Sequence, residues 1–184
     1  MKEQPMLTTA RLILRPYVPS DAKELQRLIG DRAVADTNVW VSHPYTDDLA
    51  EEFIGKRQFE FEENKSVMLA ITDRVLGFFI GGIGLTISIE HQKAEIGYWL
   101  GVPFWHNGYC TEAVRAVLKY GFGTLGLYLI YATHMTRNPR SGNVMQKIGM
   151  KHEGQMRQVW KRWDKFEDGE RYSILRSEFD NLHC

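Results

Sequence analysis

The chain has 184 residues, 43% of them hydrophobic, and is expected to form a single domain, residues 1–184, with a sizeable core. Its 23 basic and 23 acidic residues balance to a formal net charge of zero. This argues against a protein whose net charge attracts nucleic acid or an anionic membrane. Two cysteines, Cys110 and Cys184, are poor material for a disulfide framework, and without a secretion pattern or an apolar run of ~18–20 residues the chain is expected to be cytoplasmic and not bound to a membrane.

The first half of the chain predicts helices followed by a meander of strands. Ser20 can cap one helix, and Thr46 or Asp47 can cap a second. The runs that follow are rich in β-branched residues, and the short turns at 73–74 and 90–92 predict antiparallel pairing between them. The expected elements are a strand at 11–16, a helix at 21–30, a loop-like stretch to Pro44, a helix to about 64, and strands at 67–72, 75–89 and 93–100.

The second half predicts a right-handed crossover from the strand at 93–100, through a helix from 111 to about 125, to a parallel strand at 129–134. Another helix at 141–148 ends at Gly149. Two β-like runs, 153–163 and 171–177, are expected to form a hairpin that turns at Asp168-Gly169. The predicted fold class is therefore α/β, with a mixed, mostly antiparallel central sheet flanked by helices.

The segment from Pro103 to Ala113 joins a predicted strand to a predicted helix through a short turn at Gly108. The first N–H groups of such a helix lack intrahelical acceptors and carry positive potential, which suits a phosphate group. The alternative is a tight connection that binds nothing. The chain contains neither the Gly-x-Gly-x-x-Gly of dinucleotide-binding folds nor a P-loop, and no metal-ligand spacing, so no metal is expected.

Several longer motifs follow one another along the chain. They are Glu95-Ile96-Gly97-Tyr98-Trp99, then Trp105-x-x-Gly108-Tyr109-x-Thr111-Glu112-Ala113, then Asn138-x-x-Ser141-x-x-Val144-x-x-Lys147-x-Gly149-Met150. In this order and spacing they closely resemble the GNAT superfamily of N-acetyltransferases. Residues 9–16 and 172–178 are similar to the ends of its RimJ/RimL group, the ribosomal-protein N-terminal acetyltransferases. The resemblance covers about residues 7–180 and implies a sheet that is splayed open at its middle, where family members hold acetyl-CoA.

The resemblance also implies which residues would hold the acetyl-CoA cosubstrate. The CoA pyrophosphate would lie on backbone N–H groups from His106 to Thr111, and the pantetheine arm would pair with the backbone of the strand before them. Ordinary core packing is the alternative for the strand's aromatic side chains, and a plain turn is the alternative for Asn138. The implied cofactor-binding residues are Tyr98, Trp99, Leu100, Trp105, His106, Asn107, Gly108, Tyr109, Cys110, Thr111, Asn138 and Asn143.

Two residues are candidates for proton transfer. Glu95 matches an acidic residue of RimJ/RimL-like enzymes and would remove a proton from the acceptor amine. It could instead lie on a solvated face or pair with a cation. Many GNAT enzymes protonate the departing thiolate with a tyrosine, but the matching position here is Met145. Ser141 resembles a serine of the RimJ/RimL group that could donate instead; its alternative role is to cap a helix, in which case solvent would be the donor.

The resemblance favours the N-terminal α-amine of a protein or peptide as acceptor, with ribosome association as a further expectation. A small amine, a polyamine or an aminoglycoside stays open, as does a non-catalytic acyl-CoA-binding module. The chain could be a monomer or a homodimer, and nucleic-acid binding is not expected as its main function. Aromatic residues that could read the acceptor lie in the 31–45 segment and the C-terminal hairpin, namely Trp40, His43, Tyr45, Trp160 and Trp163.

Overall fold

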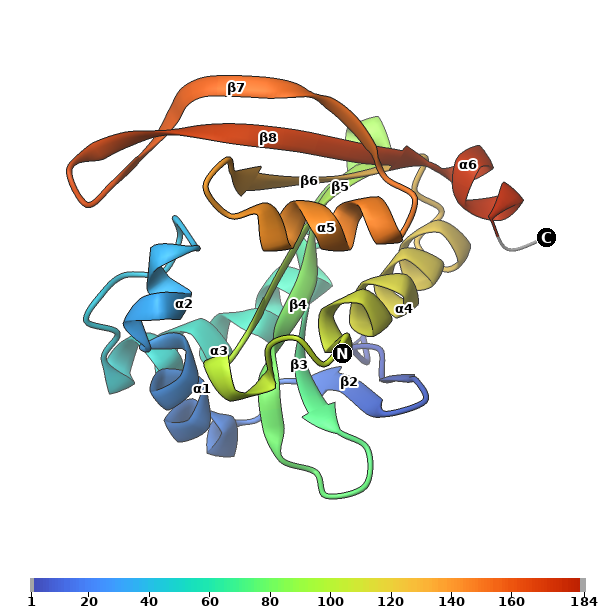
Figure 1. Ribbon diagram of the computed structural model, residues 1–184. Helices are drawn as coiled ribbons and strands as arrows, with labels where there is room; N and C mark the ends of the chain where they lie inside the picture. Colours follow the sequence, from blue (N-terminus) through green and yellow to red (C-terminus); the bar gives the residue numbers. More distant parts are fainter. Residues whose placement is uncertain (1, 183–184) are drawn as a thin grey trace.

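A computed structural model of the chain describes residues 2–182 (Figure 1). Within these residues, eight strands form one sheet in the order β1-β2-β3-β4-β5-β6-β8-β7. All neighbouring strands run antiparallel except β5 and β6, which are parallel. The strands are β1 (Leu7–Thr8), β2 (Leu12–Pro16), β3 (Ser66–Asp73), β4 (Phe79–Ser88), β5 (Lys93–Leu100), β6 (Leu129–Met135), β7 (Lys151–Arg162) and β8 (Lys165–Leu175). The expected fold class is confirmed.

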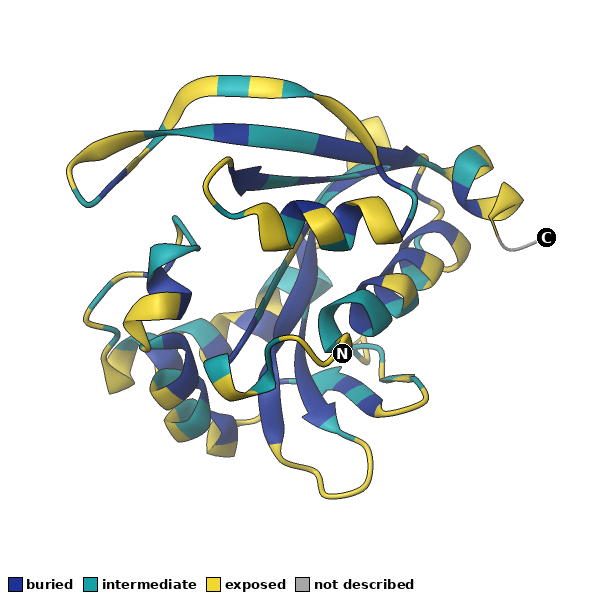
Figure 2. Cartoon of the chain, in the orientation of Figure 1, coloured by how far each residue is buried: buried dark blue, intermediate teal, exposed yellow. Residues whose placement is uncertain are grey.

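Helices cover both faces of the sheet, and each face has its own hydrophobic core. On one face, α1 to α3 pack through residues such as Leu25, Leu28 and Ile54. On the other, Val114, Val117 and Phe122 of α4 recur at helical spacing and pack on the sheet together with α5 and α6. Figure 2 shows that β3 and β4 are largely buried, whereas β7 is mostly exposed. The helices are α1 (Ala22–Ile29), α2 (Arg32–Asp36), α3 (Asp47–Glu62), α4 (Tyr109–Gly123), α5 (Pro139–Lys147) and α6 (Arg176–Asn181).

The sheet opens between its two parallel strands. β5 pairs with β4 along its whole length, from Lys93 to Leu100. Within the described residues, its pairing with β6 is confined to Lys93, Ala94 and Glu95. Beyond Glu95 the facing edges of β5 and β6 therefore have no ladder between them, and the expected splay is confirmed. The last paired residue, Glu95, stands at the point where the strands part.

The C-terminal hairpin does not turn where the sequence predicts. Its turn is formed by Trp163 and Asp164, which both adopt left-handed conformations, with φ of 49° and 60°. Asp168 and Gly169 instead belong to β8, where Gly169 is paired with Met156. A Cβ on Gly169 would stand 2.6 Å from Cζ3 of Trp160. The glycine is thus explained by the indole that packs against it, and the predicted turn at Asp168-Gly169 is wrong.

Side-chain caps account for two smaller differences. The stretch expected to be a loop after residue 30 contains α2, because the Asp31 carboxylate accepts the N–H of Ala33 at 2.8 Å and starts a helix. The strand expected at 75–89 begins only at Phe79, because Asp73 accepts the N–H groups of Val75 and Leu76 and holds them in a turn.

A buried ion pair fixes the entry into α1. The Asp21 carboxylate accepts hydrogen bonds from Nη1 and Nη2 of Arg15, at 2.7 and 2.8 Å, and from the N–H of Val18 at 2.9 Å. Asp21→Ala would leave these donors without their partner, so we expect it to lower the free energy of unfolding by about 3 kcal/mol. Urea unfolding measures the change. Asp31→Ala, which removes an exposed helix cap, is the control and should cost only about 1 kcal/mol. Equal losses in the two variants would contradict the prediction.

Candidate active site

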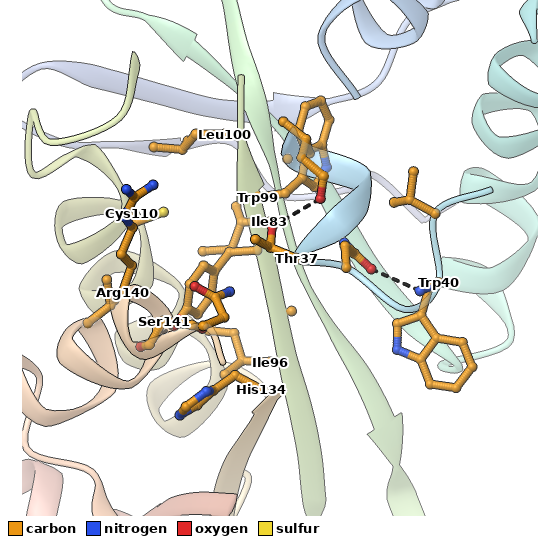
Figure 3. Close-up of a pocket in the computed structure, with 18 of the residues that line it drawn as sticks. Thr37, Trp40, Ile83, Ile96, Trp99, Leu100, Cys110, His134, Arg140 and Ser141 are labelled. Atoms are coloured by element: carbon orange, nitrogen blue, oxygen red, sulfur yellow. Dashed lines mark hydrogen bonds between the residues drawn. The ribbon is translucent and has the colours of Figure 1, made fainter. Parts of the chain in front are cut away.

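A cavity of about 830 Å³ lies at the opening of the sheet and reaches both faces of it. Glu95 and the rest of β5 line it, as do the turn before α4, the first turns of α5 and parts of α1 to α3. Figure 3 shows Cys110, Arg140 and Ser141 at one side of the cavity, and Thr37 and Trp40 at the other. The structure thus brings together every residue of the predicted site except Asn107, which is not among the cavity-lining residues.

The turn at Gly108 presents free backbone donors to this cavity. Gly108 has φ of 76° and His106 has φ of 65°, both left-handed conformations. The first N–H that donates within α4 is that of Glu112, which bonds to the Gly108 carbonyl at 3.1 Å. The N–H groups of Gly108 to Thr111 precede it and have no intrahelical acceptor. They point outward at the positive end of the helix dipole, which is the arrangement that binds a phosphate.

Two residues from the segment between β1 and β2, neither of them lining the cavity, bind this turn. The Arg11 guanidinium donates to the Asn107 carbonyl at 2.9 Å and to the Glu112 carboxylate at 2.7 Å. Thr9 donates its hydroxyl to the same carboxylate at 2.6 Å. Burial alone would raise the pKa of Glu112, but the hydrogen bonds from Thr9 and Arg11 bring it below its usual value. Asn107 therefore supports the turn through its backbone, and the anionic Glu112 ties the turn to the segment between β1 and β2.

Cys110 lies in the first turn of α4, and burial raises the pKa of its thiol to about 12. The thiol is therefore protonated at neutral pH, and it is not a nucleophile there. We expect iodoacetamide to alkylate Cys110 at pH 8 ~100-fold or more slowly than glutathione, with a rate that keeps rising with pH toward 12. A Cys184→Ser background, in which Cys184 lies outside the described residues, isolates the signal. A rate that levels off near pH 9 would contradict this.

Beyond Glu95, the edge of β5 that faces β6 has no partner strand within the described residues. This part of β5 forms one wall of the cavity through Tyr98, Trp99 and Leu100. The Tyr98 hydroxyl lies 3.0 Å from Oγ of Ser141 and 3.1 Å from its carbonyl oxygen. Burial raises the pKa of Tyr98, so its phenol is neutral. This pair links β5 to α5 across the cavity. Both residues belong to the sequence motifs, but nothing in the sequence predicts a hydrogen bond between their hydroxyl groups.

The Glu95 carboxylate lies at the same wall, where β5 and β6 separate. Its Oε1 accepts a hydrogen bond from the Thr133 hydroxyl of β6 at 2.7 Å. Within residues 2–182, Glu95 forms no ion pair, so the cation-pairing alternative has no support in the structure. The carboxylate is fixed by a neutral donor and faces the cavity as a hydrogen-bond acceptor.

The start of α5 completes the side of the cavity that faces α4. Asn138 is the N-cap residue, its side chain makes no capping bond, and both Asn138 and Asn143 line the cavity. Ser141 is the third residue after the N-cap, so the alternative that Ser141 caps the helix is wrong. Met145, at the position where many family members carry a tyrosine, is only 1% exposed. Arg140 also lines this side, with its guanidinium over the ring of Trp105 at 5.0 Å.

The aromatic residues that were expected to contact the acceptor divide into two sets. Trp40, Tyr45 and Trp160 line the cavity, and Trp40 is 81% exposed at its rim. His43 and Trp163 do not line it, and their rings pack edge to face at 5.9 Å.

Trp163 also fastens the tip of the β7–β8 hairpin onto α2 through Asp36. Figure 1 shows the hairpin tip extending to the side of the molecule where α2 lies. Its indole N–H donates to Asp36 at 2.7 Å, and Arg137 pairs with the same carboxylate at 2.9 Å. Arg162 and Trp163 are thus both engaged within the molecule. Arg162 donates to the carbonyl of Ala35, and the guanidinium of Arg32 lies 4.9 Å from the Trp163 ring.

Two further observations concern residues 2–182 as a whole. No cluster of three or more His, Cys, Asp or Glu side chains in this range is arranged to hold a metal ion. No helix in the same range is both long enough and apolar enough to span a bilayer.

The family model described as an acetyltransferase (GNAT) domain matches residues 11–151. The chain belongs to the GNAT acetyltransferase family. It is 30% identical over 173 residues to YoaA of Bacillus subtilis (strain 168), described as an uncharacterized N-acetyltransferase, with 94% of this chain and 97% of the relative covered. The crystal structure of a GNAT-family acetyltransferase from Bacillus anthracis has a TM-score of 0.84 and 25% identity, covering 95% of this chain and 100% of that chain. This GNAT chain is therefore an N-acetyltransferase.

More distant GNAT relatives differ in the acceptor that they are named for. Spermidine N(1)-acetyltransferase of Vibrio cholerae is 22% identical over 173 residues, with 94% of this chain and 97% of the relative covered. RimL, a ribosomal-protein α-N-acetyltransferase solved in complex with coenzyme A, has a TM-score of 0.85 and 17% identity, covering 93% of this chain and 98% of that chain. Homology thus establishes acetyl transfer by this GNAT chain, and the acceptor has to be argued from its own cavity.

Proposed function

We propose that this GNAT enzyme transfers the acetyl group of acetyl-CoA to the N-terminal α-amine of a peptide or protein, as the RimJ/RimL group does. One observation carries the proposal: a single cavity joins the free N–H groups at the start of α4 to the Glu95 carboxylate at the opening of the sheet. Ribosome association is part of the proposal only if the acceptor proves to be a ribosomal protein.

The residues present fit acetyl-CoA. The donors of Gly108 to Thr111, next to His106 and Tyr109, suit its pyrophosphate. The edge of β5 that faces β6 is unpaired beyond Glu95, and its backbone groups can pair with the amide groups of a pantetheine arm, much as with another strand. At the end of this edge the Leu100 carbonyl already accepts a hydrogen bond from the Trp105 indole at 2.8 Å. Asn138 and Asn143 offer side-chain amides from the facing helix. RimL, which shares the fold, was solved with coenzyme A.

Acetyl-CoA supplies an activated acyl group, and the chain's own residues would orient and protonate the reactants. Glu95 would take the proton of the acceptor amine, directly or through water. Backbone N–H groups on the unpaired edge of β5 would donate to the carbonyl oxygen as it gains negative charge. The proton for the sulfur would come from the Ser141 hydroxyl, which would regain a proton from solvent as it donates. The neutral Tyr98 phenol 3.0 Å away can donate a hydrogen bond to the Ser141 oxygen during this transfer.

Ser141→Ala and Tyr98→Phe test this proton donor. We expect Ser141→Ala to lower kcat by about a hundredfold, the lower end for general acid catalysis. Tyr98→Phe should lower kcat less, because it removes only the partner that orients Ser141. Neither change removes a helix cap, and Ser177→Ala on α6 is the matched control. A wild-type kcat for Ser141→Ala would leave solvent as the donor and contradict the assignment.

The function itself is tested by CoA release from acetyl-CoA with peptides, spermidine, an aminoglycoside and small amines as acceptors. Thermal melting with and without acetyl-CoA is measured on the same samples, since a ligand that binds the folded state raises the melting temperature. We expect stabilisation by acetyl-CoA and turnover with peptides. Stabilisation with turnover only on spermidine or the aminoglycoside would overturn the peptide acceptor, and no stabilisation would overturn the cofactor site.

A further inference from the structure

The cavity continues past Glu95 into a compartment in which Trp99, through its side chain, is the one proposed CoA-binding residue. Its walls come from the helical layer of α1 to α3, from the segment after α2 and from β4. Most of these side chains belong to the hydrophobic core on that face of the sheet. The apolar and aromatic residues of this compartment include Leu25, Ile29, Val34, Val41, Tyr45 and Phe53.

Charge is nearly absent from the compartment. Among the described residues that line the whole cavity, Glu95 is the one carboxylate, and the lysine and arginine side chains, Lys147 and Arg140, both come from α5 on the CoA side. The nearby carboxylate of Asp36 is engaged by Arg137 and Trp163. One carboxylate can balance one ammonium group, and a second or third ammonium buried here would have no counter-ion, at a cost of several kcal/mol.

Two hydrogen-bond donors interrupt the apolar wall. The hydroxyl of Tyr17 and the indole N–H of Trp99 meet above Gly82, 2.2 and 2.6 Å from the point where a Cβ on that glycine would stand. All three residues line the cavity, and Gly82 is the register partner of Trp99. Within residues 2–182, neither the Tyr17 hydroxyl nor the Trp99 N–H has a hydrogen-bond partner.

Packing holds the two donors in place. The Tyr17 ring contacts Phe53 edge to face at 5.3 Å, and both Tyr17 and Trp99 pack on Phe79, with ring centroids 6.0 and 6.1 Å away. Burial raises the pKa of Tyr17, so the phenol keeps its proton. Both side chains line the cavity, so a ligand oxygen that enters it can accept hydrogen bonds from both donors.

Resting on the proposed function, we infer that Tyr17 and Trp99 bind a neutral carbonyl oxygen of the acceptor, so that the substrate is a single amine next to an amide and an apolar side chain. A peptide N-terminus has this pattern, with the amine toward Glu95 and the first peptide carbonyl toward the two donors. A free carboxylate fits less well, because no lysine or arginine among the described residues lines this compartment. The guanidinium of Arg57 behind Tyr17 and Tyr45 is already paired with Glu60 at 2.9 Å. A polyamine has no oxygen for the donors and too many positive charges for one carboxylate.

Kinetics with two matched acceptors test the inference. Phenylalaninamide has an aromatic group, one amine and a neutral carbonyl, and phenethylamine has the same aromatic group and amine without the carbonyl. Their amines differ in basicity, so each variant is compared with wild type on the same substrate. We expect Tyr17→Phe and Trp99→Phe each to lower kcat/KM for phenylalaninamide at least about tenfold more than for phenethylamine, as removal of one partner of a hydrogen bond does.

The outcomes separate the inference from the proposed function. Equal losses on both substrates mean that the two side chains act only through packing, which overturns the inference while acetyl transfer stands. A higher kcat/KM for spermidine than for phenylalaninamide also overturns it. If wild type turns over none of the amines, although acetyl-CoA raises its melting temperature, the proposed acceptor class itself fails. Phe78→Leu, in the loop before β4 and outside the cavity lining, is the control for a changed aromatic residue.

Discussion

Glu95→Gln is expected to lower kcat at neutral pH by about a hundredfold or more, because the amide cannot accept the proton that the acceptor amine loses. The Kd for acetyl-CoA should stay near that of wild type. The substitution is nearly isosteric, and Oε1 can still accept the hydrogen bond that Thr133 donates at 2.7 Å. Initial rates of CoA release give kcat, and calorimetric titration gives the Kd.

Glu90→Gln provides the matched control for Glu95→Gln. Glu90 is exposed in the turn between β4 and β5 and does not line the cavity, so the same chemical change there should leave kcat unaltered. Wild-type turnover by Glu95→Gln would remove this carboxylate from the mechanism. A large loss of acetyl-CoA affinity together with turnover would show that Glu95 supports the structure of the site instead.

Gly108→Val is expected to raise the Kd for coenzyme A by about a hundredfold, equivalent to roughly two charge-assisted hydrogen bonds lost at the turn. Gly108 adopts φ of 76°, where a β-branched residue is strained, so the turn would have to change its course. The N–H groups of Gly108 to Thr111 would then no longer converge on one anion. Calorimetric titration with coenzyme A measures the effect without requiring turnover.

A second variant, Gly126→Val, separates the effect of backbone strain on stability from the effect of losing the anion site on binding. Gly126 has φ of 68°, has no atom within 4 Å of an added Cβ, and is not among the cavity-lining residues. Gly126→Val should therefore lower thermal stability as Gly108→Val does and leave the Kd for coenzyme A unchanged. Equal weakening of binding in both variants would mean that the turn at Gly108 does not bind the phosphates.

The sequence was sufficient to predict the parts of the site that lie within one motif. A strand, a glycine turn and an apolar helical repeat follow one another from Glu95 to Phe122, and local preferences determine each of them. The antiparallel meander and the parallel crossover followed from the lengths of the connections. The opening of the sheet was implied by the resemblance alone, because no local pattern states that β5 and β6 part after Glu95. The roles assigned to the site residues remain predictions.

Contacts between distant segments could not be predicted. Tyr17, Gly82 and Trp99 meet only because the sheet register places Gly82 opposite Trp99 and the end of β2 brings Tyr17 to them. The hairpin illustrates the same limit, since Asp168-Gly169 has the composition of a turn. The indole of Trp160 occupies the space above Gly169, so tertiary packing decided the conformation there.

The position of the transferred acetyl group tests the central claim most directly. Wild-type enzyme is incubated with acetyl-CoA and a peptide that has a free N-terminal phenylalanine and an internal lysine, and fragment masses then locate the acetyl group. We predict acetylation of the α-amine with the lysine unmodified, because the cavity places one carboxylate and two donors to receive an amine beside a carbonyl. Acetylation of the lysine alone, or an unmodified peptide under conditions in which spermidine is acetylated, would contradict the proposal.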